Sequence, residues 1–378
     1  MKILILTSAH PTDDVRVMTK IAGGFCDLGH EVVWCGPDTS FFDTARDPRI
    51  TWRLTERQSG WRGRLLSLAR SARTAAQYKD ADWIYTPDPD AALAALAVSK
   101  KNGAKTLFDI HEDFHNGLLR RGIKNDNLAA LAGRVVNSLL SWTARRSNLT
   151  IAVSPVLLDL YTSSNSARLA VLNTAPADFS SLERRQLHSS DPLRVIHGKA
   201  MSGNGTPAVV KAVEQLPVDS RVEVLFIVSG GPGAAPFDEE ITNRLRQDDL
   251  SSRVVCLEGI PHREMPDLLQ SCDIGMIAYG RVLGEASLPN RLFEYMAAGV
   301  AVLAPNYSPE IVKILEENSC GMTADFEDSQ DIAMKIQLLS NDPSAVKKMG
   351  EAGRVAFREK FSWEAQRDRL AEAMESEL

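Results

Sequence analysis

The sequence predicts an α/β protein built from two doubly wound domains. Short apolar runs alternate with segments of helical period along nearly the whole chain, and this alternation is typical of parallel strands wrapped by helices. The alternation loosens at residues 174–192, where serine, proline and charged residues accumulate. A chain of 378 residues is also longer than chains that usually fold around a single hydrophobic core. The two series of elements therefore predict two domains.

The first predicted domain covers residues 1–175, and a linker follows at 176–192. Its expected strands are the apolar runs Lys2–Thr7, Glu31–Cys35, Trp83–Tyr85, Lys105–Asp109 and Leu149–Val153. The segments between these runs have helical period. They predict the helices Val15–Leu28, Gly63–Tyr78 and Ala91–Lys100.

The second predicted domain covers residues 193–360 and repeats the same pattern. Its expected strands are Leu193–His197, Val222–Val228, Val254–Leu257, Ile274–Ala278 and Val300–Ala304. The last helix, Trp363–Met374, is amphipathic, so the tail 361–378 could fold back on either domain, the first being the candidate. Ligands of doubly wound sheets bind beyond the carboxyl ends of the strands, so two such domains facing each other would enclose an interdomain cleft.

The composition excludes several classes of protein. A formal net charge of −6 at pH 7 argues against a nucleic-acid-binding protein. Residues 1–185 carry 24 basic and 19 acidic side chains, whereas the rest carry 19 and 30, which indicates different partners for the two domains. The five cysteines lack metal-ligand spacing, as expected of reduced core residues. The N-terminal apolar run is too short for a signal peptide, and no run approaches the roughly 20 residues of a membrane span, so we expect a cytoplasmic protein.

One segment, residues 287–300, carries most of the chemical information. Ser287 is expected to cap a helix, Pro289 to stand in its first turn and Gly299 to end it in a left-handed conformation. A helix N-terminus presents unpaired N–H groups and a partial positive charge, which suit a phosphate. Glu294 lies more than one turn into this helix, where its carboxylate could accept hydrogen bonds from sugar hydroxyls. The alternative is an ordinary surface glutamate on a core helix.

The chain resembles the GT-B-fold retaining glycosyltransferases of family 4, known as glycosyl transferases group 1, over nearly its whole length. In the first half the matching motifs are Asp14-Val15-Arg16-Val17, Gly29-His30-Glu31-Val32, Asp109-Ile110-His111-Glu112-Asp113 and Val153-Ser154. In the second half they are His197-Gly198 with Gly205, Ile227-Val228-Ser229-Gly230-Gly231-Pro232, Leu257-Glu258-Gly259-Ile260-Pro261-His262, Cys272-Asp273-Ile274-Gly275-Met276, the Pro289–Gly299 helix, Pro309-Glu310-Ile311-Val312 and Cys320-Gly321-Met322. The motifs occur in the family's order, and the ordered set is far more specific than any one of them.

The resemblance implies a nucleotide-sugar donor, with a UDP-sugar favoured, held by the second domain. It implies that Glu294 binds the ribose hydroxyls. It also implies that backbone N–H groups around Ser287, Leu288 and Pro289 hold the diphosphate. Backbone near Ile260 and His262 would contact the base.

Two positions depart from the family pattern. The family has a second glutamate eight positions before the ribose carboxylate, where this chain has Ala286, preceded by Glu285. Either Glu285 replaces it or backbone alone recognises the sugar. In the loop from Gly198 to Gly205, the family has Arg or Lys before the last glycine, where this chain has Asn204. Lys199 is the loop's cation and could reach the phosphates from its other end; a plain turn is the alternative.

His111 follows an apolar strand and belongs to a short cluster of histidines and carboxylates. The resemblance gives the family's histidine a place beside the transferred sugar, so His111 is the catalytic candidate together with Glu294. A metal site in residues 111–115 is the alternative, but the family needs no metal for catalysis, and no metal or other cofactor is expected. The pair Asp88 and Asp90 imitates the metal-binding motif of another glycosyltransferase fold, yet its prolines indicate a turn that begins a helix.

The segment after the first strand is expected to line the acceptor side. It contains His10, Asp13, Asp14 and Arg16. Asp13 and Asp14 have an equally good alternative role as caps of the helix that begins at Val15.

The function expected from the resemblance is transfer of a sugar, of the hexosyltransferase type, to an acceptor hydroxyl with retention of configuration. The acceptor would be a sugar, a lipid-linked or a small molecule, as in the biosynthesis of polysaccharides, glycolipids or glycosylated metabolites. The rival hypotheses are a non-catalytic sugar-nucleotide-binding subunit and a GT-B epimerase of the sugar nucleotide.

Residues 57–79 are basic and amphipathic. They carry no acidic side chain, and leucines and Trp61 stand among their arginines. Such a helix can lie on an anionic membrane surface, here the inner face of the membrane, or it can be a solvated helix packed on the sheet. Both alternatives stay open.

Overall fold

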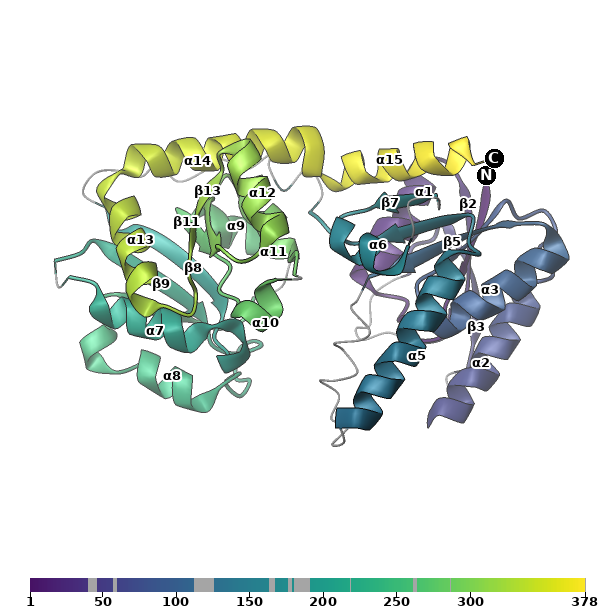
Figure 1. Ribbon diagram of the computed structural model, residues 1–378, viewed down its shortest axis with the longest axis horizontal. Coiled ribbons are helices and arrows are strands. Elements are labelled where there is room, and N and C mark those ends of the chain that lie inside the picture. Colours follow the sequence, from purple (N-terminus) through teal and green to yellow (C-terminus); the bar gives the residue numbers. More distant parts are fainter. Residues whose placement is uncertain are drawn as a thin grey trace. The chain divides into compact units, whose positions relative to one another are not determined.

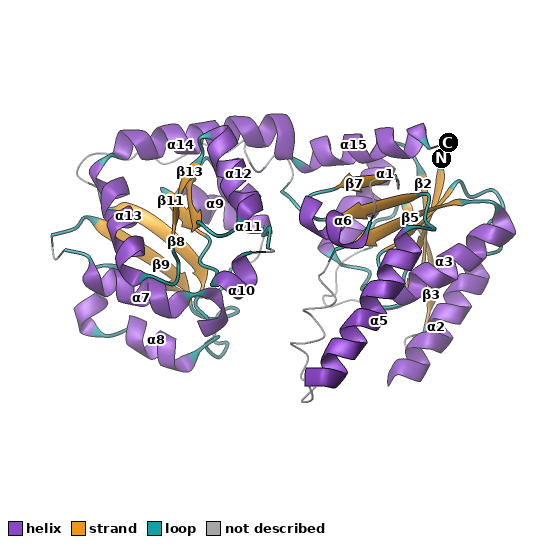
Figure 2. Ribbon diagram, in the orientation of Figure 1, coloured by secondary structure: helices purple, strands orange, loops and turns teal. Residues whose placement is uncertain are grey.

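The chain forms two compact units, each built around one parallel sheet (Figures 1 and 2). The structure is a computed structural model that describes residues 1–39, 46–56, 60–111, 126–162, 167–175, 179, 191–217, 219–260, 264–285 and 287–377. The first unit consists of Met1–Asn173 with Gln366–Leu378, and the second of Thr174–Ala365.

The sheet of the first unit has the strand order β3-β2-β1-β4-β5-β6-β7, with every described pair parallel. The strands are β1 Lys2–Leu6, β2 Glu31–Pro37, β3 Ile50–Thr55, β4 Trp83–Thr86, β5 Lys105–Ile110, β6 Leu149–Ala152 and β7 Arg168–Ala170. The inner strands are nearly all buried, as expected where helices cover both faces of a parallel sheet.

Helices of the first unit bury the strand side chains on the faces of the sheet. They are η1 Val15–Ala22, α1 Gly23–Asp27, α2 Gly60–Ala75, α3 Pro89–Asn102, α5 Asp126–Ala144, α6 Pro155–Tyr161 and, at the C-terminus, α15 Trp363–Ser376. One cluster joins Leu4 and Leu6 of β1 to Leu68 of α2 and Val98 of α3. A second cluster packs α5 and α6 on the ends of β5 and β6.

The sheet of the second unit has the strand order β10-β9-β8-β11-β12-β13, again with parallel pairs. The strands are β8 Leu193–Lys199, β9 Val222–Ile227, β10 Val254–Leu257, β11 Ile274–Met276, β12 Ala301–Pro305 and β13 Gly321–Ala324.

The helices of the second unit follow the strands in alternation. They are η3 Ser202–Asn204, α7 Thr206–Gln215, α8 Glu239–Leu245, η4 Asp248–Leu250, α9 Met265–Gln270, α10 Arg281–Gly284, α11 Asn290–Ala298, α12 Pro309–Asn318, α13 Ser329–Asn341, α14 Pro343–Ala356 and η6 Phe357–Phe361. Proline stands in the first turn of α7, α12 and α14, where its missing N–H costs no helical hydrogen bond.

The expected α/β class is confirmed, and every strand expected from an apolar run is present with small shifts at its ends. The strands β3, β7 and β13 and the helices α5 and α6 were not expected from the sequence. The missed strands lie at the edges of the sheets, and their residues are mostly half-buried, so they lack a continuous apolar run. The expected linker lies largely outside the described residues.

The C-terminal tail returns to the first unit. Leu370 and Met374 of α15 are buried, and Arg367 lies 3.8 Å from the carboxylate of Asp27 in α1. The structure thus assigns residues 366–378 to the first unit, while residues 361–365 belong to the second. No helix in the described part of the chain is both long and apolar enough to cross a membrane.

Candidate active site

The polar residues of the first unit gather where the strand order of its sheet reverses. Successive strands run from β1 outward to β2 and β3, and the chain then returns to β4 on the other side of β1. In doubly wound sheets the crevice at such a switch point is the usual ligand site. The segments that leave β1, β4 and β5 carry His10, Asp88 and His111 respectively.

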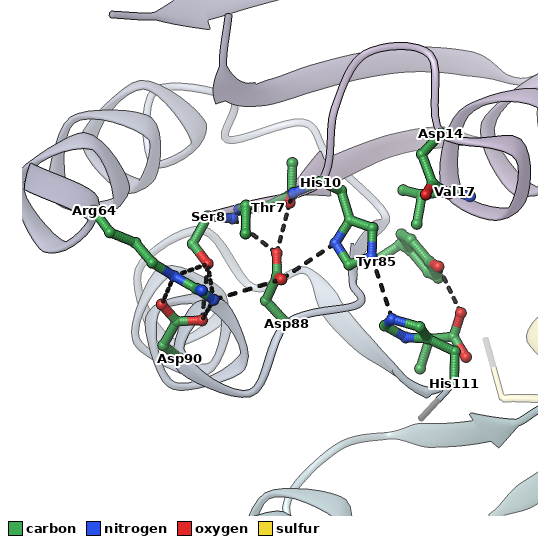
Figure 3. A network of polar contacts seen from close by, with 12 residues as sticks. Thr7, Ser8, His10, Asp14, Val17, Arg64, Tyr85, Asp88, Asp90 and His111 are labelled. Carbon is green, nitrogen blue, oxygen red and sulfur yellow. Dashed lines mark hydrogen bonds and ion pairs between the residues drawn. The ribbon is translucent and has the colours of Figure 1, made fainter. Parts of the chain in front are cut away.

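A carboxylate and two imidazoles form a continuous chain at this point (Figure 3). One oxygen of Asp88 accepts hydrogen bonds from the hydroxyl of Thr7 at 2.6 Å and from the N–H of Ser8 at 2.8 Å. Its other oxygen lies 3.2 Å from Nδ1 of His10. Nε2 of His10 lies 3.2 Å from Nε2 of His111, with the two rings edge to face. Both histidines were expected site residues, whereas Asp88 was expected only to belong to a turn, and the contact between the histidines was not expected.

Burial and neighbouring polar groups shift the pKa values of Asp88 and His10 in opposite directions. Burial raises the pKa of Asp88, but hydrogen bonds from His10, Thr7 and Ser8 outweigh it and hold the pKa well below its ordinary value. Burial lowers the pKa of His10, but Asp88, Asp14 and Asp109 together raise it above its ordinary value. The geometry therefore favours an ionised Asp88 beside a proton-binding His10.

A second carboxylate, Asp90, belongs to a separate set of contacts. It binds the guanidinium of Arg64 on α2 at 2.7 and 2.8 Å and accepts from the hydroxyl of Ser8 at 2.8 Å. Helix α3 begins at Pro89, so the turn expected around Asp88 and Asp90 is confirmed. The described residues contain no group of three or more histidine, cysteine or carboxylate side chains arranged to hold a metal ion.

Arg16 is buried inside the domain, which argues against the expected acceptor contact. Its guanidinium makes a two-pronged ion pair with Asp109 at 2.8 and 2.9 Å and donates to the carbonyl of Val171 at 3.2 Å. The hydroxyl of Tyr85 donates to the same carboxylate at 2.6 Å. Burial raises the pKa of Asp109, but the charge and hydrogen bonds of Arg16 outweigh burial. The pKa of Asp109 is therefore below its ordinary value. We therefore assign Arg16 a structural role beneath the switch point.

Asp14 takes the capping role that the sequence left open. Its carboxylate accepts a hydrogen bond from the N–H of Val17 at 2.6 Å, at the start of η1. The helix expected at Val15–Leu28 begins with wide π-type turns and continues as α1. Asp13 is half-buried beside the cap. Residues 112–115, which follow His111, lie outside the described residues.

The second unit also has a switch point, between β8 and β11. The loop that leaves β8 begins with Gly198 and ends with Gly205, and both have positive φ angles, of 89° and 69°. A Cβ atom on Gly205 would lie 2.4 Å from the carbonyl oxygen of Ala278, which follows β11. Only glycine permits this approach, so the loop backbone packs directly against the residues that follow β11.

Arg291 brings a cation to this loop, and the sequence analysis missed it. Its Nη1 donates to the carbonyl of His197 at 3.3 Å and would lie 3.0 Å from a Cβ on Gly198. Its guanidinium also lies 5.8 Å from the ring centre of Tyr279. Burial, with a smaller contribution from the charge of Arg291, lowers the pKa of His197 to about 3. A long basic residue in the first turn of a predicted phosphate-binding helix was the available signal.

The other expected residues of this loop have different contacts. Lys199 is exposed, and its ammonium lies 5.4 Å from the ring centre of Phe237. The side-chain amide of Asn204 donates to the carbonyl of Lys199 at 3.4 Å and so closes the loop on itself. Arg291, from α11, therefore supplies a cation at the Gly198 end of the loop.

The helix that carries Glu294 starts later than expected. Helix α11 begins at Asn290, and Pro289 is its N-cap, so the prediction that Ser287 caps this helix was wrong. The extended backbone at Pro289 keeps the preceding residues out of the helix. Glu294 is half-buried on the second turn, and Gly299 ends the helix with a φ angle of 71°, as expected.

The remaining donor-side residues are only partly described. Ser287 and Leu288 are half-buried in the segment between α10 and α11. Glu285 is exposed just after α10, and Ile260 is half-buried on the loop after β10. Ala286 and His262 lie outside the described residues.

Known sequence families match both units. Residues 15–174 match the family described as Glycosyltransferase Family 4. Residues 184–356 match the family described as Glycosyl transferases group 1. Comparison with curated protein sequences gives no match.

Solved structures share the fold along the whole chain. The structure of Anabaena HepE in complex with UDP has a TM-score of 0.73 at 19% identity, covering 100% of both chains. Sucrose-phosphate synthase from Thermosynechococcus elongatus has a TM-score of 0.73 at 14% identity, covering 99% of this chain and 98% of that one. The UDP-forming trehalose-phosphate synthase from Burkholderia xenovorans has a TM-score of 0.65 at 13% identity, covering 99% and 100%.

At these identities the structural likeness concerns the fold, which is the expected GT-B fold of two Rossmann-like domains. The two sequence families, in contrast, match the first and second units at the places where the sequence motifs of both halves were found. The chain therefore belongs to the group 1 glycosyltransferases of family 4 and is a glycosyltransferase.

Proposed function

We propose that this glycosyltransferase moves a sugar from a nucleotide-diphosphate sugar, with UDP as the favoured nucleotide, to an acceptor hydroxyl with retention of configuration. The observation that carries the donor assignment is the contact of Arg291 with the Gly198–Gly205 loop at the switch point of the second unit. A cation, an open glycine loop and a helix N-terminus at one crevice suit a diphosphate. Structures of Anabaena HepE hold UDP or UDP-glucose, which supports the choice of nucleotide.

The donor contacts follow from this placement and from the resemblance. Arg291 and Lys199 would neutralise the diphosphate, and N–H groups around Ser287 and Leu288 would donate to it. Glu294 would accept hydrogen bonds from the ribose, and Glu285 is the nearest described carboxylate to the position that holds the sugar in the family. We propose base contacts near Ile260 and His262.

For the reaction itself we propose a front-face displacement beside His111. The bond between the anomeric carbon and the leaving phosphate oxygen breaks while the acceptor oxygen bonds to the same face of that carbon. The acceptor proton passes to the leaving phosphate oxygen. The cations at the diphosphate stabilise the departing charge, a task for which no bound metal is needed in this proposal.

The acceptor side is proposed to lie in the first unit, with His10 and Asp13 near it. We propose that the unit also contacts the inner face of a membrane through α2, so a lipid-linked acceptor is the favoured class. Helix α2 exposes arginines together with leucines: Leu65 is 49% and Leu66 54% exposed, beside the exposed Arg62, Arg70 and Arg73. Basic side chains attract anionic lipid, and leucines enter the interface.

Nucleotide binding by matched variants tests the donor site. We expect Glu294→Ala to weaken binding of both UDP and uridine by roughly 10- to 100-fold, because a charged hydrogen-bond acceptor of the ribose is lost. We expect Arg291→Gln to weaken UDP by a similar roughly 10- to 100-fold but to leave uridine unchanged, because uridine has no phosphate. Calorimetric titration measures both.

The control is Glu317→Ala, which removes an exposed glutamate from α12 in the same unit. It should bind UDP and uridine as the unaltered protein does. Full UDP affinity in Glu294→Ala and Arg291→Gln would refute the proposed donor site. Thermal stabilisation by GDP or ADP but not UDP would refute the choice of nucleotide.

A further inference from the structure

The carboxylate of Asp88 stands at the start of helix α3 but contacts the end of β1 instead of capping the helix. It is the N-cap of α3, with the extended backbone of that position, where an aspartate usually accepts a hydrogen bond from the helix. The carboxylate makes no capping bond to the described residues of α3. It is turned instead toward the end of β1, where Thr7 and Ser8 hold it and His10 faces it.

We propose that Asp88 is a positioning residue for sugar transfer, which through His10 fixes the ring orientation of His111 and, in the neutral pair, its tautomer. The inference rests on the proposed function, in which His111 lies beside the transferred sugar. The sequence motifs assign Asp88 only to a turn that begins a helix, and the family matches give it no role. Asp88 touches His10 but not His111, so its effect passes through the intervening ring (Figure 3).

The fixed orientation follows from three contacts in series. Asp88 is only 4% exposed, and two donors from the same segment hold one of its oxygens. The second oxygen therefore has a set place, and it faces Nδ1 of His10. Nδ1 of His10 lies 3.2 Å from the carboxylate and Nε2 lies 3.2 Å from His111, so rotation of that ring would break a contact at each end.

The fixed tautomer follows from the chemistry of the same contacts. An ionised carboxylate has no proton to donate, and its negative charge 3.2 Å from Nδ1 favours the His10 tautomer that carries the proton on Nδ1. The two facing Nε2 atoms, 3.2 Å apart, can then share one proton. In the neutral pair His111 donates and His10 accepts. In the singly protonated pair the added proton is on Nδ1 of His111, while Nε2 of His10 donates to Nε2 of His111, so the positive charge lies on His10.

The charges around the pair favour that added proton. Among the described residues, the titratable groups that act on His10 are the carboxylates of Asp88, Asp14 and Asp109 and the neighbouring imidazole of His111. Arg64, from α2, lies 3.7 Å from Asp88 and is held mainly by Asp90. Asp88 lies in direct contact with His10.

Asp90 provides a matched control. It is an aspartate two positions along the same helix start, and it also accepts a hydrogen bond from Ser8. Its remaining partner is Arg64 rather than a histidine. Asp88→Asn and Asp90→Asn therefore remove the same charge by the same change of atoms, one with and one without contact to the imidazole pair.

The first experiment reads the tautomers directly in the full chain. Nitrogen NMR of ¹⁵N-imidazole-labelled protein is recorded above the titration of the pair, and His10→Gln and His111→Gln identify the two sets of signals. We expect His10 as the Nδ1–H form and His111 as the Nε2–H form. In Asp88→Asn the side-chain NH₂ faces Nδ1, so both histidines should change to the opposite tautomer, while Asp90→Asn should match the unaltered protein. Unchanged tautomers in Asp88→Asn would overturn the inference.

The second experiment measures transfer as a function of pH. We expect Asp88→Asn to lower kcat by about 10- to 100-fold, as is typical when the partner of a functional imidazole is lost. The KM for the donor should change by no more than about twofold, because donor binding is assigned to the second unit. The acidic limb of kcat should move to lower pH, since removing the carboxylate disfavours the protonated pair. Asp90→Asn should keep the kcat and pH profile of the unaltered enzyme.

The two experiments separate the inference from the function on which it rests. Equal losses of kcat in Asp88→Asn and Asp90→Asn would overturn the positioning role even if transfer is confirmed. If the unaltered protein transfers no sugar from any nucleotide donor, the proposed function fails, and the NMR result still decides whether Asp88 sets the tautomers.

Discussion

At the scale of single residues, three aspartates of the first unit have the same side chain but different roles. Asp14 and Asp88 each precede a helix and Asp109 lies within β5, yet one caps a helix, one faces an imidazole and one is buried against Arg16. Their surroundings, rather than the carboxylate itself, set these roles. Removing Arg16 would leave a buried unpaired charge, which explains why this arginine is needed even without a ligand.

The pair of Asp88 and His10 should make the stability of the first unit depend on pH. The pKa of His10 is raised in the folded state, so its contribution is fully present below the unfolded pKa and is lost as the pH rises through the folded pKa. The pKa of Asp88 is lowered, so its own contribution is lost only in acid, below its ordinary value. We therefore expect Asp88→Asn to lose more unfolding free energy at pH 6 than at pH 9.

Urea unfolding of the variant and the unaltered protein at both pH values measures this difference. Asp90→Asn is the control, because Asp90 pairs with an arginine that stays charged throughout this range, so its loss should be the same at both pH values. An equal loss for Asp88→Asn at pH 6 and pH 9 would contradict the assignment of the proton to His10.

At the scale of elements, the exposed face of helix α2 is amphipathic, which indicates a binding surface. Helix α2 buries Leu68 and Ala75 against the sheet and keeps leucines and arginines on its outer face. Isolated exposed leucines are ordinary, but their spacing beside basic residues at helical intervals defines one face. That face is independent of the switch-point network except at Arg64, which binds Asp90.

Reversing two charges on this face should release the protein from anionic membranes. Each basic residue near such a surface contributes about 1 kcal/mol, so Arg62→Glu with Arg70→Glu should weaken binding by at least about 30-fold. Flotation with vesicles that contain anionic lipid measures this, and zwitterionic vesicles give the baseline. The control is Lys100→Glu with Lys101→Glu at the end of α3. Equal flotation of both double variants would argue against a membrane-binding α2.

At the scale of the whole molecule, the chain passes between the units twice. The two passages are held beside each other, because the N–H of Trp363 donates to the carbonyl of Ala175 at 2.8 Å and the N–H of Leu172 donates to Gln366 at 3.2 Å. The first unit is therefore incomplete without the end of the chain. Its last helix contributes two fully buried apolar side chains, Leu370 and Met374.

Removal of residues 366–378 should destabilise the first unit alone. Losing a buried leucine or methionine side chain costs about 2–5 kcal/mol, so the first unit should unfold at a clearly lower temperature. Differential scanning calorimetry measures the two transitions, and UDP identifies that of the second unit by raising it. A chain shortened only by residues 377–378 is the control. A parallel decrease in both transitions would show that the tail belongs equally to both units.

Much of the fold was predictable because its signals are local. Buried parallel strands such as β1 and β12 require continuous apolar runs, and these stand out in the sequence. Edge strands such as β3 and β7 are only half-buried, so their composition resembles that of loops. The start of α11 was misplaced for a similar reason, since Ser287 has the chemistry of a cap but Pro289 takes that position.

The sequence predicted several residues of the candidate site, but it did not predict the contacts between them. The sequence singled out His10, His111 and the Gly198 loop as site residues, but it assigned Asp88 only to a turn and gave Arg291 no role. Those two residues become informative through distant contacts: Asp88 binds Ser8, 80 positions away, and Arg291 binds His197, 94 positions away. Their partners depend on which strands lie side by side, and no local pattern encodes this.

The sequence by itself determined the class of this protein: two α/β domains, their approximate boundaries and the segments that end each strand. It did so because apolar runs, helical periods and turn residues act within a few neighbouring positions. The tertiary structure alone decided that β1 lies beside β4 and β8 beside β11. Strand order is chosen by packing between distant segments, and it brings together His10 and His111, which are 101 positions apart.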